Sequence, residues 1–233
     1  MHDRPLAIQL ILVPAGVEYW AVKWGLYRAK QSAQALPKIM AIPAGPSGVQ
    51  TFLETGVLNY LSAEDGVLLV GLGGGLSHTH AAGDGIVLSR ICHGLEESDG
   101  AAYDCDPTLT RQIAERLVAT VGTGVTCDRV VTTAEEKKRL CDRFKADVVD
   151  MESAVLVGSL AQATNCKVAV LRVISDDAQS ALPDISSAIS EKGELQIGAI
   201  AMSFLRQPVA AMRLIRSAQK GLSGLSAALS RLF

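Results

Sequence analysis

The segment from Val168 to Asp177 constrains the fold more than any other part of the chain. It begins with a nearly continuous apolar run, typical of a strand covered on both faces, and it ends in two aspartates. A second acidic motif, Asp150-Met-Glu-Ser153, precedes it and opens a predicted helix that ends near Thr164. Two sets of carboxylates can therefore meet at the carboxyl edge of a sheet, where open α/β folds bind ligands.

Apolar strands and helices alternate along the rest of the chain. Strands are expected at 6–13, 38–42, 66–70, 83–88, 124–131 and 168–174. Helices are expected at 17–32, 49–61, 108–121, 134–144, 150–164 and from about 185. Residues 94–107 are acidic and irregular and are expected to form a surface loop. This order predicts an α/β fold in which a mixed, mostly buried sheet is flanked by helices. A length of 233 residues favours a single domain.

Composition and short motifs exclude several classes of function. A net charge of −2 gives no global sign of nucleic-acid binding. The five cysteines form no CxxC pair, and His78, His80 and His93 lack a carboxylate pattern, so they are expected to be loop histidines and no metal or organic cofactor is expected. The start predicts a strand instead of a signal peptide, and no apolar run reaches the ~18 residues of a membrane helix. A cytoplasmic protein is therefore expected.

The glycine run Gly71–Gly75 follows a predicted buried strand. Glycines there let backbone amides, such as those of Gly73 and Gly74, approach an anion or a sugar closely. A dinucleotide-binding motif would need glycine at position 76, where this chain has leucine, and a helix afterwards. The sequence therefore does not fit a dinucleotide-binding motif. The alternative to a glycine run that binds a ligand is a purely structural glycine turn.

Three carboxyl groups are candidates for chemistry. Glu152 lies near a predicted helix start, whose positive end favours the charged carboxylate. Asp176 shares a strand face with Arg172 and emerges from apolar surroundings, where burial favours a carboxyl that keeps a proton. Glu18 stands at a strand-to-helix junction near the same edge. The structural alternatives are a helix cap, a strand-ending turn and a solvated first-turn glutamate.

The tail 208–233 is basic and apolar. It carries no acidic residue, and its charged side chains are Arg213, Arg216, Lys220 and Arg231. Such a helix can lie on an anionic membrane surface, or it can pack on the domain formed by residues 1–207 with its basic face in water.

Taken together, the segments Gly71–Leu76 with Gly83-Asp84, Val149–Ser153 and Leu171–Asp176 resemble the purine nucleoside phosphorylase / methylthioadenosine nucleosidase superfamily. The resemblance covers roughly residues 6–205 and implies that single-domain fold. Within it, hopanoid-biosynthesis-associated phosphorylases, which act on adenosylhopane, are most similar. That closer likeness rests on Thr132–Lys137, on Ser175–Pro183, and on Gln207-Pro208 with Leu214–Arg216.

The resemblance implies an enzyme that cleaves an adenosine-like nucleoside and releases adenine. Asp176 would donate a proton to N7 of the purine, Glu152 would bind the ribose hydroxyls, and Glu18 would orient an attacking water. Met151 would pack on the ribose, and the base pocket would be lined by Val130 and Val131. A homo-oligomer, dimer or larger, is also implied.

Two departures leave the nucleophile open between phosphate and water. Leu72 stands where family members often have serine, and Leu69 where many phosphorylases have arginine. Gly73 and Gly74 amides or Arg172 are the remaining phosphate ligands, so phosphate stays a potential co-substrate. The alternatives are a methylthioadenosine/S-adenosylhomocysteine-type nucleosidase and a degenerate relative that binds a nucleoside or lipid without turnover.

Overall fold

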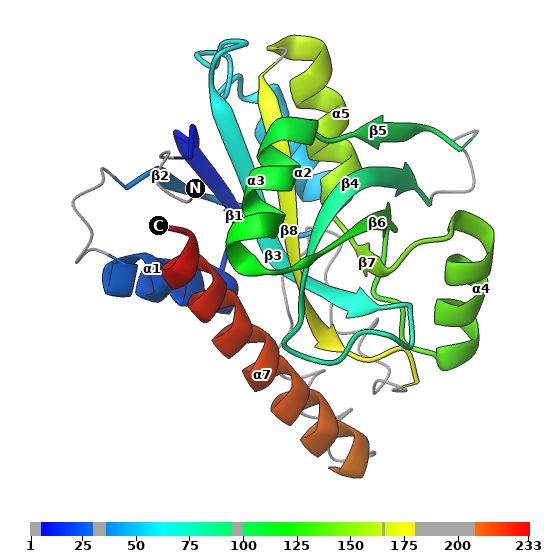
Figure 1. The fold of residues 1–233 in the computed structure, drawn as a ribbon. Coiled ribbons are helices and arrows are strands. Elements are labelled where there is room, and N and C mark those ends of the chain that lie inside the picture. The colour runs from blue at the N-terminus through cyan, green and yellow to red at the C-terminus, as the bar shows by residue number, and fades with distance from the viewer. Residues whose placement is uncertain (1–5, 30–35, 95–99, 165, 180–207) are drawn as a thin grey trace.

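The computed structural model describes residues 6–29, 36–94, 100–164, 166–179 and 208–233 (Figure 1). Within these ranges the strands are β1 (Leu10–Pro14), β2 (Lys38–Ile42), β3 (Gly66–Gly75), β4 (Gly85–His93), β5 (Ala102–Asp104), β6 (Thr120–Thr126), β7 (Val148–Asp150) and β8 (Lys167–Asp176). The helices are α1 (Val17–Ala29), α2 (Pro46–Glu54), α3 (Pro107–Leu117), α4 (Ala134–Phe144), α5 (Ser153–Ala163) and α7 (Pro208–Leu232). The predicted α/β fold, a mixed sheet flanked by helices, is confirmed.

Five strands of the sheet close into a ring. β8 pairs in parallel with β3 and antiparallel with β4. β6 pairs in parallel with both β4 and β7, and β7 returns antiparallel to β3. β1 and β2 extend the sheet beyond β3, and β5 extends it beyond β4. β8 is therefore hydrogen-bonded along both sides, which explains its apolar sequence.

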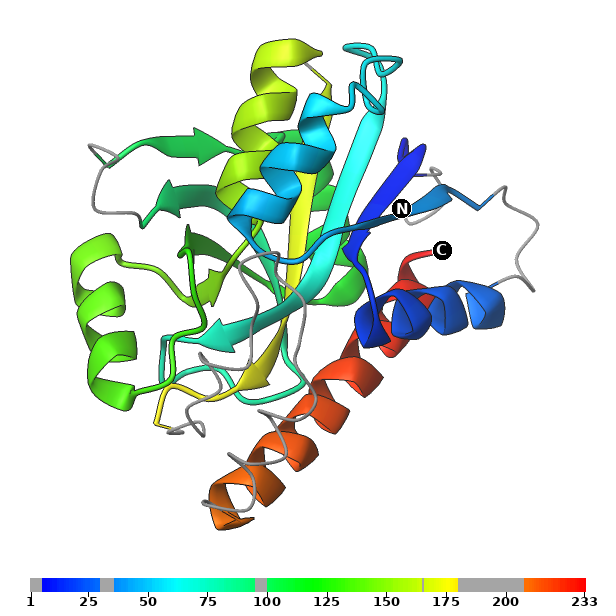
Figure 2. The same ribbon diagram turned by 180° about the vertical axis from the view of Figure 1, so that it is seen from behind.

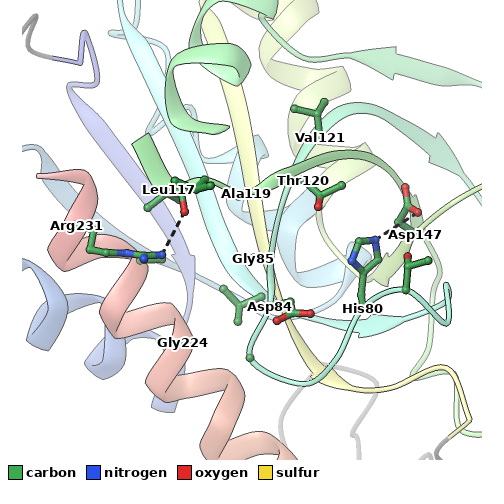
Figure 3. Close-up of a pocket in the computed structure, with 15 residues that line it drawn as sticks. His80, Asp84, Gly85, Leu117, Ala119, Thr120, Val121, Asp147, Gly224 and Arg231 are labelled. Atoms are coloured by element: carbon green, nitrogen blue, oxygen red, sulfur yellow. Dashed lines mark hydrogen bonds and ion pairs between the residues drawn. The ribbon is translucent and has the colours of Figure 1, made fainter. Parts of the chain in front are cut away.

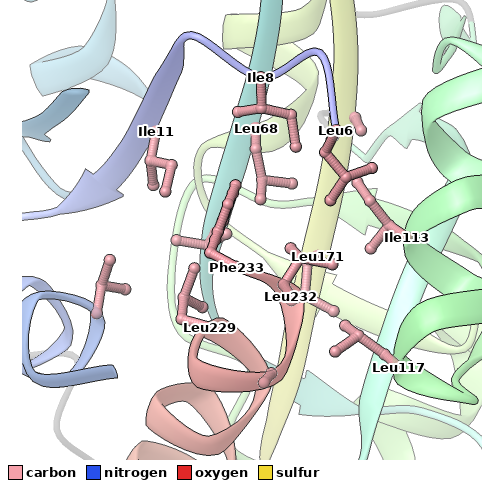
Figure 4. Close-up of a cluster of buried hydrophobic side chains, with 14 of the residues drawn as sticks. Leu6, Ile8, Ile11, Leu68, Ile113, Leu117, Leu171, Leu229, Leu232 and Phe233 are labelled. Atoms are coloured by element: carbon pink, nitrogen blue, oxygen red, sulfur yellow. The ribbon is translucent and has the colours of Figure 1, made fainter. Parts of the chain in front are cut away.

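Two large apolar clusters hold five of the helices on the sheet. The cluster in Figure 4 joins α1, α3 and α7 to one face, where Leu171 packs with Leu229, Leu232 and Phe233. The second cluster joins α2 and α5 to the other face, which Figure 2 shows from the front. The C-terminal half of α7 is thus part of the core. The division of the chain at residue 207 stays a prediction, since residues 180–207 lie outside the described ranges.

The glycine run is strand instead of turn. β3 continues to Gly75, and Gly71 pairs with Arg172 of β8. A Cβ added at Gly71 would lie 2.2 Å from Arg172 Nη1, and one at Gly73 would lie 2.5 Å from Val148 Cγ2. The glycines therefore leave room for side chains that cross this strand.

Several predicted boundaries were wrong. The helix expected at 108–121 ends at Leu117, because Val118 takes the left-handed conformation with φ 54°, and β6 ends at Thr126 instead of residue 131. The expected loop 94–107 contains β5, and His93 ends β4 instead of lying in a loop. The helix expected at 49–61 is α2 at Pro46–Glu54. The helix expected from about 185 lies outside the described residues.

Candidate active site

A fully buried arginine joins the two acidic segments. Arg172 Nε donates to Asp150 Oδ2 at 2.8 Å, and its Nη2 donates to Glu152 Oε2 at 3.3 Å. Nη2 also donates to Ser153 Oγ at 3.0 Å. Asp150 ends β7 and Ser153 begins α5, so the motif wraps around the guanidinium. From the sequence, Arg172 was considered only as a phosphate ligand, whereas here it organises the carboxylates.

Asp150 fixes the loop that carries the motif. Its Oδ1 accepts hydrogen bonds from the backbone amides of Glu152 at 3.3 Å and Ser153 at 3.2 Å, and from Thr126 Oγ1 at 2.6 Å. Thr126 Oγ1 in turn accepts from the Ala154 amide at 2.9 Å. The strand ends β6 and β7 and the start of α5 are therefore tied together, which holds Glu152 in one position.

Glu152 is buried between the arginine and the loop before α2. Its Oε1 accepts a hydrogen bond from the Gly45 amide at 3.0 Å. Burial raises the pKa of Glu152, while the charge of Arg172 acts in the opposite direction. The expectation that the helix start favours its charged form is therefore offset by burial. Met151 lies beside the same loop, since a Cβ added at Gly45 would lie 3.5 Å from Met151 Cε.

Glu18, in the first turn of α1, points into this cluster. Its Oε1 accepts a hydrogen bond from the Leu72 amide at 2.5 Å. Burial and, after it, the charge of Glu152 raise the pKa of Glu18 to about 7, while the Leu72 hydrogen bond and Arg172 oppose the shift. Glu18 is therefore not a solvated first-turn residue. A carboxyl with this pKa can exchange a proton at neutral pH, as a general base must.

Asp176 is buried, but its surroundings are polar, whereas apolar surroundings were expected. Its Oδ2 forms an ion pair with Nζ of the fully buried Lys137, which also donates to the Asp177 carbonyl at 2.7 Å. Its Oδ1 accepts from Ser175 Oγ at 2.6 Å. No separate role for Lys137 was predicted from the sequence. A lysine among exposed charged residues of a helix looks solvated, and only the packing of α4 reveals its burial.

The alternation along β8 breaks before Asp176. Gly73 pairs with Ile174 and Gly74 with Asp176, so Ser175 is an extra residue in β8. The expectation that Asp176 shares a face with Arg172 was therefore wrong. The irregularity brings the Asp176 carboxyl next to Gly74, where an added Cβ would lie 3.5 Å from Oδ2.

The remaining predicted residues lie on β3 and in the segment that follows β6. Gly74 pairs with Val149 on its other side, next to Asp150. Val130 is half-buried, and Val131 is buried in an apolar cluster with Leu76 and Val149. A cavity of about 1520 Å³ lies between the start of α2, the residues after β6 and α4. Its lining includes Pro46, which follows Gly45, and Arg129, which precedes Val130. The roles of Val130, Val131, Gly73 and Gly74 stay predictions.

A second cavity, of about 680 Å³, lies elsewhere (Figure 3). His80 Nε2 lies 3.7 Å from Asp147 Oδ1 at one end, and Arg231 of α7 lines the other, where it donates to the Leu117 carbonyl. None of the predicted site residues lines it. Among the described residues, no three His, Cys, Asp or Glu side chains gather as a metal site would require.

The chain belongs to the phosphorylase superfamily, whose family model matches residues 44–206. A comparison with curated proteins found no match.

Several solved structures share the fold. The 5′-methylthioadenosine/S-adenosylhomocysteine nucleosidase of Helicobacter pylori is 19% identical, with a TM-score of 0.61 over 95% of this chain and 97% of that chain. The S-adenosylhomocysteine nucleosidase of Streptococcus pyogenes is 17% identical, with a TM-score of 0.62 over 96% and 97%. The futalosine hydrolase of Helicobacter pylori is 18% identical, with a TM-score of 0.61 over 95% and 97%.

Proposed function

We propose that this protein is an enzyme that cleaves the N-glycosidic bond of an adenosine-like nucleoside and releases adenine. The observation that carries the proposal is the meeting of strand ends around Gly74. Asp176 pairs with Gly74 on one side and Val149 pairs with it on the other, next to the acidic motif. Two strand spacings separate the backbones of Asp176 and Val149 by roughly 10 Å. That separation suits a purine held on one side and its ribose on the other.

Each acid has a distinct task in this mechanism. Asp176 passes a proton to N7 of the purine while the C1′–N9 bond breaks and its electron pair stays with the base, and the ammonium of Lys137, which is paired with the Asp176 carboxylate, supplies that proton. Glu152 accepts hydrogen bonds from the ribose hydroxyls, and its charge stabilises the cationic sugar. Met151 packs on the ribose, and Val130 and Val131 line the base pocket. Glu18 takes a proton from the nucleophile.

Water is the nucleophile that the site favours over phosphate. Glu18, Asp150 and Glu152 all face the single charge of Arg172. A phosphate anion entering this cluster would be repelled by the carboxylates. Leu69 is buried in the core and Leu72 offers only its amide, which already serves Glu18. The similar structures named above are nucleosidases and a hydrolase, which accords with water.

The finer assignment concerns the 5′ substituent. The sequence resemblance to hopanoid-associated phosphorylases supports an apolar group, as in adenosylhopane, and a role in hopanoid biosynthesis is part of the proposal. The second candidate is a methylthioadenosine/S-adenosylhomocysteine nucleosidase, which the names of the similar structures favour. A cytoplasmic homo-oligomer is part of the proposal. Among the described helices, none is long and apolar enough to cross a membrane.

The first experiment measures adenine release from adenosine, 5′-methylthioadenosine and adenosylhopane, with and without phosphate. Wild-type protein is expected to release adenine without phosphate. Asp176→Asn is expected to lower the rate by about 10²–10⁴-fold, because it removes general-acid catalysis. Asp104→Asn, at an exposed ion pair with Arg90, is the matched control and should keep the rate. Nucleoside binding without release of base by wild-type protein would support the degenerate relative and refute the enzyme.

A further inference from the structure

Both tryptophans of the chain lie on one exposed side of α1. The exposed fractions are 63% for Trp20, 59% for Trp24, 65% for Tyr27 and 66% for Val17. Their spacing of three, four and three residues places them on one face of a helix. The opposite face is buried and packs through Val22, Gly25, Leu26 and Ala29. We call Val17, Trp20, Trp24 and Tyr27 the aromatic stripe.

The rings of the aromatic stripe contact one another or neighbouring side chains of α1. The rings of Trp24 and Tyr27 stack with centroids 5.6 Å apart and an angle of 21°. Trp20 meets Tyr19 edge to face at 5.9 Å, and Lys23 Nζ lies 4.9 Å from the Trp20 ring. Exposed apolar residues scattered singly need no explanation, but a contiguous apolar surface indicates an interaction site.

The exposed charged residues of α1 are both positive. Lys23 and Arg28 are exposed on either side of it. The acid of α1, Glu18, is turned into the candidate active site. α7 packs against α1 at the outer edge of the molecule and continues beyond it, with the exposed cations Arg213, Arg216 and Lys220 and no acidic residue (Figures 1 and 2).

We propose that the aromatic stripe docks on a membrane surface that contains anionic lipids. Tryptophan and tyrosine favour the boundary between headgroups and acyl chains, and flanking lysine and arginine bind anionic headgroups. A second copy of the chain fits the stripe less well. A two-fold contact through α1 would bring Lys23 and Arg28 against the same cations of the other copy, without an exposed acid on α1 to pair them.

The proposed docking also has a consequence for which substrate reaches the candidate site. α1 carries Glu18 of the candidate site in its first turn and the aromatic stripe on its outer side. Docking would therefore hold the site close to the lipid surface, from which a nucleoside with a long apolar 5′ group is drawn. This consequence rests on the proposed function, whereas the docking itself does not.

Intrinsic fluorescence tests the docking directly, because all tryptophan emission of this chain comes from the stripe. Full-length protein is titrated with vesicles of phosphatidylcholine alone or mixed with phosphatidylglycerol. The emission is expected to shift to shorter wavelength with the anionic vesicles, and the shift is expected to weaken as salt is raised. No shift with either vesicle would overturn the proposal.

Variants separate the stripe from other surfaces. Trp20→Ser with Trp24→Ser is expected to weaken flotation with anionic vesicles by about tenfold or more, since two large apolar side chains are lost from the contact. Tyr60→Ser, at a tyrosine that is 57% exposed elsewhere, should not change flotation. Flotation that persists in the double variant would refute the stripe as the docking surface. Sedimentation that shows an oligomer in wild type and a monomer in the double variant would assign the stripe to a subunit interface instead.

Turnover distinguishes this proposal from the proposed function. The double variant is expected to release adenine from water-soluble 5′-methylthioadenosine at the wild-type rate, because the stripe lies outside the candidate site. Wild-type protein that floats with vesicles but releases no adenine from any nucleoside would uphold the docking and refute the enzyme.

Discussion

Glu18 exchanges its proton near neutral pH because it is buried beside a second glutamate. Its pKa of about 7 comes first from burial and then from the charge of Glu152, and neither is visible in the local sequence around α1. The Leu72 amide and Arg172 keep the shift from growing larger. The residue is thus set to take a proton from water under ordinary conditions.

This pKa predicts the pH dependence of the reaction. The base must be deprotonated, so kcat/KM is expected to rise about tenfold per pH unit below a pH of about 7 and to level off above it. Glu18→Gln should remove this limb and lower the rate by about 10²–10⁴-fold. Glu54→Gln, on the exposed end of α2, is the control. A profile that stays unchanged in Glu18→Gln would assign the pH dependence to another group.

The raised pKa of Glu18 makes the folded protein less stable at higher pH, where the reaction is faster. A carboxyl whose pKa is raised on folding binds more protons in the folded state, so stability falls as pH rises from 4.5 to about 7. Glu18→Gln removes this cost and can still accept the Leu72 hydrogen bond. Its melting temperature is therefore expected to exceed that of wild type at pH ~8 and to match it at pH ~4.

Lys137 assists the departure of the purine base by acting on Asp176. Lys137→Met leaves a buried carboxylate without its partner, which is expected to cost about 3–5 kcal/mol of unfolding free energy. It should also slow adenine release by about 10²-fold, because Asp176 loses the ammonium group that supplies its proton. Lys138→Met is the matched control, since Lys138 is exposed and pairs with Asp142 on the surface.

A leaving group that needs no proton separates this role from a merely structural one. Cleavage of 4-nitrophenyl riboside releases 4-nitrophenolate, a stable anion that needs no proton to depart. The folded Lys137→Met variant should therefore cleave this substrate nearly as fast as wild type. An equal loss on both substrates would mean that Lys137 only maintains the structure.

At the level of elements, α7 is a core helix as much as a basic surface. Leu225 and Leu229 are fully buried against α1 and the sheet, while Arg213 and Arg216 are exposed. Gly25 of α1 lies so close to α7 that an added Cβ would be 2.5 Å from the Ser226 carbonyl oxygen. The two helices therefore fix one another, and α1 carries Glu18.

Truncation of one α7 side chain tests this dependence. Leu229→Ala is expected to lower the unfolding free energy by about 2–5 kcal/mol, because it leaves a cavity in the core. Leu222→Ala, at a half-buried position of the same helix, should cost less. Chemical denaturation measures both. Equal losses would contradict the packing of Leu229 described above.

Elements with a strong periodic pattern were predictable from sequence, and those set by tertiary contacts were not. α4 begins and ends where its charge and apolar pattern predicts, and β8 covers the predicted apolar run. The predicted strand stopped at residue 70 and the glycine run after it was not predicted as strand, because nothing local shows that Arg172 lies across it. Helix α3 ends early at Leu117, and Val118, which follows it in the left-handed conformation, is not one of the residue types that usually signal a helix end.

Considered as a whole, the molecule has a candidate site built from segments far apart in the sequence. Glu18, Glu152 and Asp176 were named from motifs, because acids at strand and helix ends are visible in a sequence. Lys137 and the arrangement of acids around Arg172 could not be named, because they depend on how α4 and β3 pack against β8. The extra residue Ser175 likewise follows from pairing with β3 and not from the pattern of β8.

The contact between α1 and α7 has a consequence for synthesis. The helix that carries Glu18 is translated early. Its inner face is covered by Leu225 and Leu229 of α7, which is synthesised last. A nascent chain therefore has to keep Val22 and Leu26 from other partners until α7 emerges. Activity should accordingly appear only after that helix is released, and nascent α1 is where a chaperone would be expected to bind.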